Sequence, residues 1–91
     1  MADIFIERQH DFSQQDAMQR IIAIEEKLQN KFGIKLNWSD NRAAIKGSGV
    51  SGDITVRKDS ITLQLNLNFM LKPLKGKIEE AINRSVDKAL S

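Results

Sequence analysis

The sequence predicts an α+β fold: a strand, a helix, four further strands in one antiparallel sheet, and a final helix. Three observations predict it. Apolar residues recur at helical spacing in two segments. Polar and apolar residues alternate between those segments, and the turns there are short enough to join neighbouring antiparallel strands. Both helices are expected to cover one face of a curved sheet, within a single domain spanning residues 1–91.

The first helix has a recognisable start and end. A short strand begins at Ile4 and is expected to end by Gln9. Ser13 is a favoured N-cap residue, and Gly33 is the type of residue with which many helices end. Between them an apolar stripe recurs at spacings of three and four, formed by Ala17, Ile21, Ile24, Leu28 and Phe32. This pattern predicts a helix over residues 14–32.

Four segments with a period of two follow, separated by short turn clusters. They cover residues 34–38, 42–46, 50–57 and 61–69. In the last segment one face is apolar, with Ile61, Leu63, Leu65, Leu67 and Phe69. The opposite face is uncharged and is expected to meet water or a second copy of the chain, with Thr62, Gln64, Asn66 and Asn68. A homodimer is therefore a further expectation.

The second helix supplies the cover that the apolar face of the sheet needs. Pro73 suits the first turn of a helix, because its ring fixes a helical φ and no N–H partner is needed there. One stripe at helical spacing then contains Leu74, Ile78, Ala81, Ile82, Ser85, Val86 and Ala89. This stripe is expected to pack on the sheet beside the first helix.

Composition and charge argue against several classes of function. The 14 basic and 12 acidic residues are spread along the chain, whereas a nucleic-acid binder usually clusters its basic residues. The absence of cysteine removes disulfides, thiolate nucleophiles and the usual zinc sites. No apolar run approaches the roughly 20 residues of a membrane span, and residues 1–12 lack the apolar region of a signal peptide. A cytoplasmic protein that neither binds nucleic acid nor spans a membrane is expected.

The segment from Gly47 to Gly52 matches the G-x-G-x-x-G pattern of dinucleotide-binding loops. Such a loop needs a following helix, whose N–H groups bind the pyrophosphate. Here residues 53–56 continue with the alternation of a strand. The segment is therefore expected to contain a hairpin turn and to bind no cofactor. Within it, Gly52 is expected to mark a bulge or a close approach of two backbones.

His10 is the only histidine and is expected to lie on the surface or in a loop. A general base needs a nucleophile or an acid within hydrogen-bond reach, and a metal site needs more ligands than one histidine and scattered carboxylates. The adjacent acids of each helix do not face each other. The chain is therefore expected not to be an enzyme and to hold neither a metal nor a cofactor.

The connection from the last strand to the last helix has two interpretations. It combines apolar residues with lysines, namely Phe69, Met70, Leu71, Lys72, Leu74, Lys75 and Lys77. In the first interpretation, Phe69 and Leu74 belong to the core and the remaining residues only connect the elements. In the second, the segment is an apolar contact surface with a cationic rim, which requires Met70 or Leu71 to be exposed.

Four stretches resemble the polyhydroxyalkanoic acid system protein family. They are residues 4–10, residues 31–33, residues 49–52 and, most specifically, residues 71–80, which read LKPLKGKIEE. These are small bacterial proteins named for genes beside those of storage-polyester granules. The resemblance spans nearly the whole chain. It implies a setting in polyhydroxyalkanoate storage and offers no catalytic residue to assign.

The order of elements also resembles a shortened helix-grip fold, in which a curved antiparallel sheet wraps a C-terminal helix. Two functions are compatible with these resemblances. The first is a non-enzymatic accessory protein that binds the polyester granule surface, or granule proteins, through the apolar connecting segment. The alternative is a carrier of a small apolar ligand in a pocket between the sheet and the C-terminal helix. The carrier alternative rests on an analogy of fold.

Overall fold

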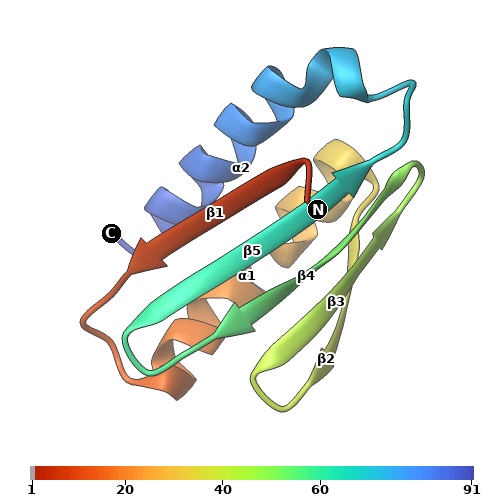
Figure 1. The fold of residues 1–91 in the computed structure, drawn as a ribbon. Coiled ribbons are helices and arrows are strands. Elements are labelled where there is room, and N and C mark those ends of the chain that lie inside the picture. Colours follow the sequence, from red (N-terminus) through yellow and green to blue (C-terminus); the bar gives the residue numbers. More distant parts are fainter. Residues whose placement is uncertain (1) are drawn as a thin grey trace.

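The computed structural model describes residues 2–91 and arranges them in two layers, a sheet and a pair of helices (Figure 1). The predicted α+β fold and its order of elements are confirmed. The elements are β1 (Ile4–Gln9), α1 (Gln14–Phe32), β2 (Lys35–Ser39), β3 (Arg42–Gly47), β4 (Val50–Val56), β5 (Ser60–Leu67), the short 3₁₀ helix η1 (Lys72–Leu74) and α2 (Lys75–Ala89).

Within residues 2–91 the strands form one antiparallel sheet in the order β1-β5-β4-β3-β2. The four strands from β2 to β5 make the predicted meander. The sequence pattern left the partner of β1 open, and the structure pairs it with β5, from Ile4 opposite Leu65 to Gln9 opposite Ser60. β1 and β2 are consequently the two edge strands of the sheet.

Both helices cover the same face of the sheet, as expected (Figure 1). α1 contacts β2 and β4, while α2 contacts β1 and also packs against α1. Trp38 is half-buried against the core between the layers, in agreement with its predicted place on the apolar face of its strand. The most deeply buried side chains come from both layers, and they include Ile4, Ile21, Ile54, Ile61, Leu65 and Ile82.

The two ends of α1 follow directly from the residues at its ends. The side chain of Ser13 accepts a hydrogen bond from the N–H of Asp16 at 3.1 Å, which satisfies one of the free donors of the first turn. Gly33 has a left-handed backbone with φ of 66°, and its N–H donates to the carbonyl of Gln29 at 2.8 Å. The helix therefore begins and ends where the sequence predicts.

The glycine-rich segment is a hairpin turn between β3 and β4, as expected. Gly47 pairs with Val50, and Gly49 adopts a φ of 80° within the turn. Gly52 lies in β4, where a Cβ atom would stand only 1.9 Å from the carbonyl oxygen of Gln64. It therefore marks the predicted close approach of two backbones, here β4 and β5.

The prediction that the last strand continues to Phe69 is wrong, because β5 ends at Leu67. A strand continues only where a neighbour offers backbone partners. β4 begins at Val50, which pairs with Leu67, and β1 reaches only to Leu65. Beyond this point the chain leaves the sheet, so the alternation no longer decides which side chains face inward.

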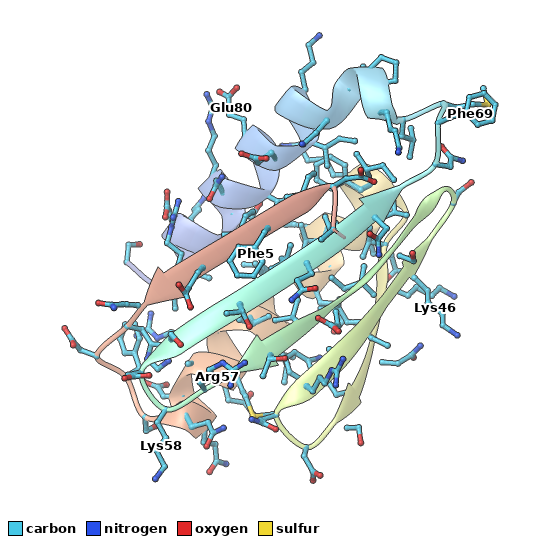
Figure 2. All side chains as sticks on the ribbon, viewed as in Figure 1. Phe5, Lys46, Arg57, Lys58, Phe69 and Glu80 are labelled. Atoms are coloured by element: carbon cyan, nitrogen blue, oxygen red, sulfur yellow. The ribbon has the colours of Figure 1, made fainter. Side chains whose placement is uncertain are left out.

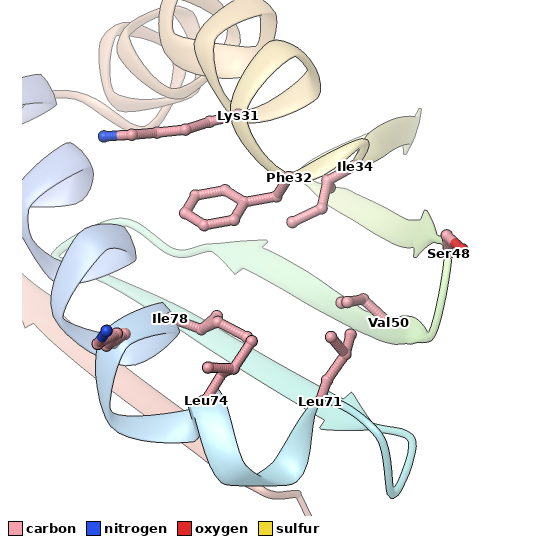
Figure 3. A pocket seen from close by; sticks show the side chains of 9 residues that line it. Lys31, Phe32, Ile34, Ser48, Val50, Leu71, Leu74 and Ile78 are labelled. Carbon is pink, nitrogen blue, oxygen red and sulfur yellow. The ribbon is translucent and has the colours of Figure 1, made fainter.

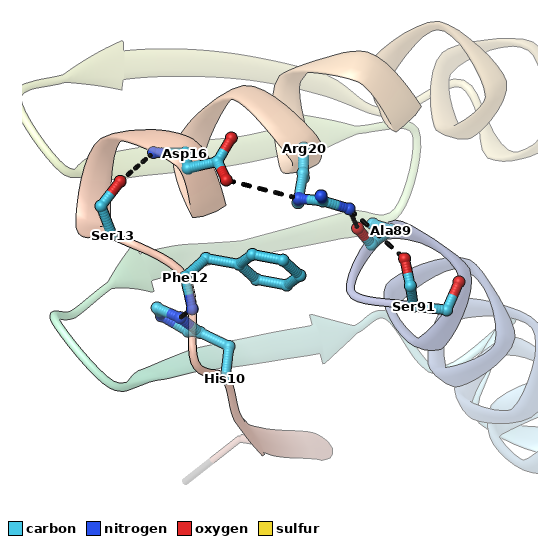
Figure 4. A network of polar contacts seen from close by, with 7 residues as sticks. All are labelled: His10, Phe12, Ser13, Asp16, Arg20, Ala89 and Ser91. Atoms are coloured by element: carbon cyan, nitrogen blue, oxygen red, sulfur yellow. Dashed lines mark hydrogen bonds and ion pairs between the residues drawn. The ribbon is translucent and has the colours of Figure 1, made fainter.

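Two arginines attach α2 to the rest of the fold. Arg8 of β1 donates to Asp87 at 2.8 Å and to Asn83 at 2.6 Å, both residues of α2. Arg20 of α1 reaches the end of α2 and donates to the carbonyl of Ala89 at 3.2 Å (Figure 4). These contacts fix the position of α2 relative to both β1 and α1.

Candidate contact surface and apolar groove

The candidate contact residues lie together at one end of the molecule, between the end of β5 and the first turns of α2 (Figures 1 and 2). We call this set the tip. It consists of the predicted residues Phe69, Met70, Leu71, Lys72, Leu74, Lys75 and Lys77.

Three apolar side chains of the tip are exposed. Phe69 is 81% exposed, Met70 71% and Leu74 45%. Figure 2 shows Phe69 pointing away from the body of the molecule. The interpretation that placed Phe69 and Leu74 in the core is therefore wrong, and the exposure that the second interpretation requires is present at Met70. Leu71 is half-buried and packs against the core.

A tight turn at Asn68 produces this exposure. The N–H of Asn68 donates to the carbonyl of Gly49 at 2.9 Å, which anchors the turn to the β3–β4 hairpin. Both the side-chain and main-chain oxygens of Asn68 accept from the N–H of Leu71, at 3.1 and 3.0 Å. Because these bonds draw Leu71 back to the fold, Phe69 and Met70 occupy the outside of the turn.

The lysines of the tip differ in their surroundings. Lys72 lies 3.6 Å from the carboxylate of Asp3. Asp3 also accepts the N–H of Leu67 at 2.7 Å, and this hydrogen bond, with the charge of Lys72, holds the pKa of the Asp3 carboxyl below its usual value. Among residues 2–91, Lys75 and Lys77 have no ion-pair partner. The rim of the tip is therefore cationic.

An apolar groove with a volume of about 360 Å³ opens beside the tip (Figure 3). It lies between the end of α1, the β3–β4 hairpin and the start of α2. It is open to solvent and not an enclosed cavity. Its lining is mostly apolar, with Phe32, Ile34, Val50, Leu71, Leu74 and Ile78 beside Lys31, Ser48 and Lys77.

Sequence reasoning found the tip but not this groove. The tip is one continuous segment whose composition is visible directly. The groove is assembled from three separate segments, and each apolar residue in them reads only as a core position. One available signal was that α1 ends and α2 begins at the same end of the antiparallel sheet, which leaves a gap between the two helix termini.

His10 lies in the loop between β1 and α1, one of the two positions expected for it, but it is buried, with 8% of its surface exposed. The backbone N–H of His10 donates to the carbonyl of Asp59 at 2.9 Å, which draws His10 against the β4–β5 turn. Nδ1 accepts the backbone N–H of Phe12 at 3.2 Å (Figure 4). This assigns the ring proton to Nε2, which lies 3.1 Å from the carbonyl oxygen of Arg57. Both ring nitrogens thus serve to fix backbone segments.

Within residues 2–91, no helix is both long enough and apolar enough to pass through a bilayer. In the same part of the chain, no three histidine, cysteine or carboxylate side chains are grouped so that they could hold a metal ion.

The fold and the tip together define a small two-layer α+β domain with an exposed, cation-rimmed apolar end. The family model of the polyhydroxyalkanoic acid system proteins matches residues 4–90. The chain belongs to this family, as the resemblance of its motifs indicates. Searches of curated proteins and of solved structures returned no match.

Proposed function

We propose that the protein is a non-enzymatic accessory protein of bacterial polyhydroxyalkanoate storage, located in the cytoplasm, and that it adsorbs to the granule surface through the tip. The family supports the setting in polyhydroxyalkanoate metabolism. The observation that carries the proposal is the exposure of Phe69, Met70 and Leu74 at one end of the molecule. Isolated exposed apolar residues are common, but a contiguous group with a polar rim is typical of interaction sites.

Adsorption of this kind needs only the burial of apolar surface. Storage polyester is apolar, and removing a large side chain such as phenylalanine or methionine from water contributes about 1.5–3 kcal/mol when burial is complete. The lysines of the rim can lay their methylene stems on the same surface while their ammonium groups remain in water. The tip therefore combines attraction to an apolar phase with solubility of the free protein.

Co-sedimentation with purified granules tests the proposal. The double variant Phe69→Asp with Met70→Asp places two charges at the outside of the turn without touching a buried residue. We expect it to lose most of its granule binding, with an unchanged circular dichroism spectrum. Phe5→Asp is the matched control, because Phe5 is also an exposed phenylalanine, at 57%, but lies on the outer face of the sheet (Figure 2).

The two variants distinguish binding through the tip from non-specific adsorption of exposed apolar residues. Undiminished binding of the double variant would refute the tip as the contact surface. Equal losses in the double variant and in Phe5→Asp would also refute it, since exposed apolar area anywhere on the molecule would then explain the binding.

A further inference from the structure

We propose that the apolar groove binds a single-chain amphiphile, with the aliphatic chain in the groove and an anionic phosphate head among the lysines at its mouth. The groove shares Leu71, Leu74 and Lys77 with the tip, but Phe69 and Met70 on the outside of the turn do not line it. The proposal therefore does not depend on binding to granules.

The walls of the groove suit an aliphatic chain. Phe32 and Ile34 form one wall at the end of α1, and Leu74 and Ile78 form the opposite wall on η1 and α2 (Figure 3). Val50 and Leu71 close the end toward the hairpin. Their side chains offer no hydrogen-bond donor or acceptor, so the favourable interaction is burial of chain methylenes. A volume of about 360 Å³ is small among ligand sites but within their usual range.

The charges at the groove select the head group. Lys31 and Lys77 line it, and no acidic residue does. Lys31 also lines a second, smaller groove of about 220 Å³ between α1 and α2. That groove adds three further basic residues and again no acid, namely Lys27, Arg84 and Lys88.

Most of these cations are available to a ligand. Within residues 2–91, only Arg84 of the five is in an ion pair, with Glu80. An anion held near Lys31 would share the groove with Lys77 and lie beside the second groove with its further basic residues. A phosphate monoester carries more negative charge than a carboxylate and offers more acceptor oxygens, so this arrangement favours phosphate.

Titration calorimetry with hexyl, octyl and decyl phosphate, each below its micelle concentration, measures the binding of the aliphatic chain by the groove and of the phosphate by the lysines. We expect saturable binding of one ligand per chain. The affinity should rise about fourfold per added methylene until the chain fills the groove. Decanoate should bind more weakly than decyl phosphate, and decanol about tenfold more weakly or worse, because it lacks the charge-assisted hydrogen bonds.

Variants and chemical shifts place the site. The double variant Lys31→Glu with Lys77→Glu should weaken decyl phosphate about tenfold or more, while Lys46→Glu, which changes an exposed lysine of β3 outside the groove, should not. Amide shifts in NMR spectra should change around Ile34, Val50 and Ile78. Binding without saturation, shifts confined to the outer face of the sheet, or equal affinity of both lysine variants would overturn the proposal.

The tip variants keep this inference separate from granule adsorption. Phe69 and Met70 do not line the groove. The Phe69→Asp, Met70→Asp variant should therefore bind decyl phosphate with unchanged affinity even though it is expected to lose granule binding. Loss of both activities in that variant would contradict the assignment of the ligand to the groove.

Discussion

At Gly52 the sheet has no room for a side chain. A Cβ atom there would meet the carbonyl oxygen of Gln64 at 1.9 Å, and a backbone atom of a paired strand is not free to move aside. Gly76, at the start of α2, has nothing within 4 Å of a Cβ position. A side chain is therefore excluded at Gly52 but has room at Gly76, and alanine substitution distinguishes the two positions.

We predict that Gly52→Ala lowers the free energy of unfolding by about 3 kcal/mol or more, because β4 and β5 must separate locally. Gly76→Ala should raise it by about 0.5 kcal/mol, because alanine loses less backbone entropy in a helix. Urea unfolding of the two variants beside the wild type measures both values. A tolerated Gly52→Ala would show that the two strands do not approach as closely as described.

Asp3 makes the stability of the fold depend on pH. Its pKa is lower in the folded chain, first because it accepts the N–H of Leu67 and then because Lys72 is near. A lowered pKa means that the ionised carboxylate stabilises the fold fully above the unfolded pKa of about 3.9. That stabilisation is lost as the pH falls through the folded pKa.

The variant Asp3→Asn is therefore predicted to be less stable than the wild type at neutral pH. The difference in stability should shrink below about pH 4, where the wild-type carboxylate becomes protonated and is then uncharged like the asparagine of the variant. Urea unfolding midpoints measured between neutral and acidic pH test this. A difference that stays constant over the whole range would mean that the charge of Asp3 contributes nothing.

At the level of elements, Arg20 holds the end of α2 against α1 (Figure 4). Its guanidinium lies 3.9 Å from the centre of the Phe12 ring and donates to the carbonyls of Ala89 and Ser91. A cation at a helix C-terminus satisfies free carbonyls and interacts favourably with the helix dipole. Both helices and the β1–α1 loop thus meet at one side chain.

We predict that Arg20→Ala destabilises the protein by about 1–2 kcal/mol, from the loss of the ring contact and of the carbonyl hydrogen bonds. Arg84→Ala is the matched control, since within residues 2–91 Arg84 pairs only with exposed Glu80 one turn away. It should cost about 0.5 kcal/mol or less. Thermal unfolding monitored by circular dichroism compares them, and equal effects would contradict the role assigned to Arg20.

The elements that the sequence predicts well are those determined by local residues. Ser13 and Gly33 define α1 because a cap acts on its own helix end. Phe69 was placed wrongly because the end of β5 depends on where β4 begins. The alternation of polar and apolar residues in the last segment does not show where its partner strand begins. The burial of His10 was not predicted for a related reason, since it depends on carbonyls of Arg57 and Asp59, far along the chain.

At the level of the whole molecule, the two layers leave three different surfaces. The outer face of the sheet is largely polar, although Thr62 is buried there and Phe5 is exposed beside Gln64. The row that includes Gln64 and Asn66 remains the predicted homodimer surface. The helix layer is basic near Lys31. Within residues 2–91, only the end with the tip presents several large apolar side chains to solvent together, so it is the surface on which the proposed function depends.

The chain contains no cysteine, so a polarity-sensitive fluorophore can be attached at one introduced site. Labels at Met70→Cys in the tip and at Lys46→Cys on the outer face of β3 should be compared on adding protein-free polyester particles (Figure 2). Adsorption through the tip predicts a shift to shorter emission wavelength for the label at position 70 and none at position 46. Equal shifts at both positions, or no shift at position 70, would contradict direct binding through the tip.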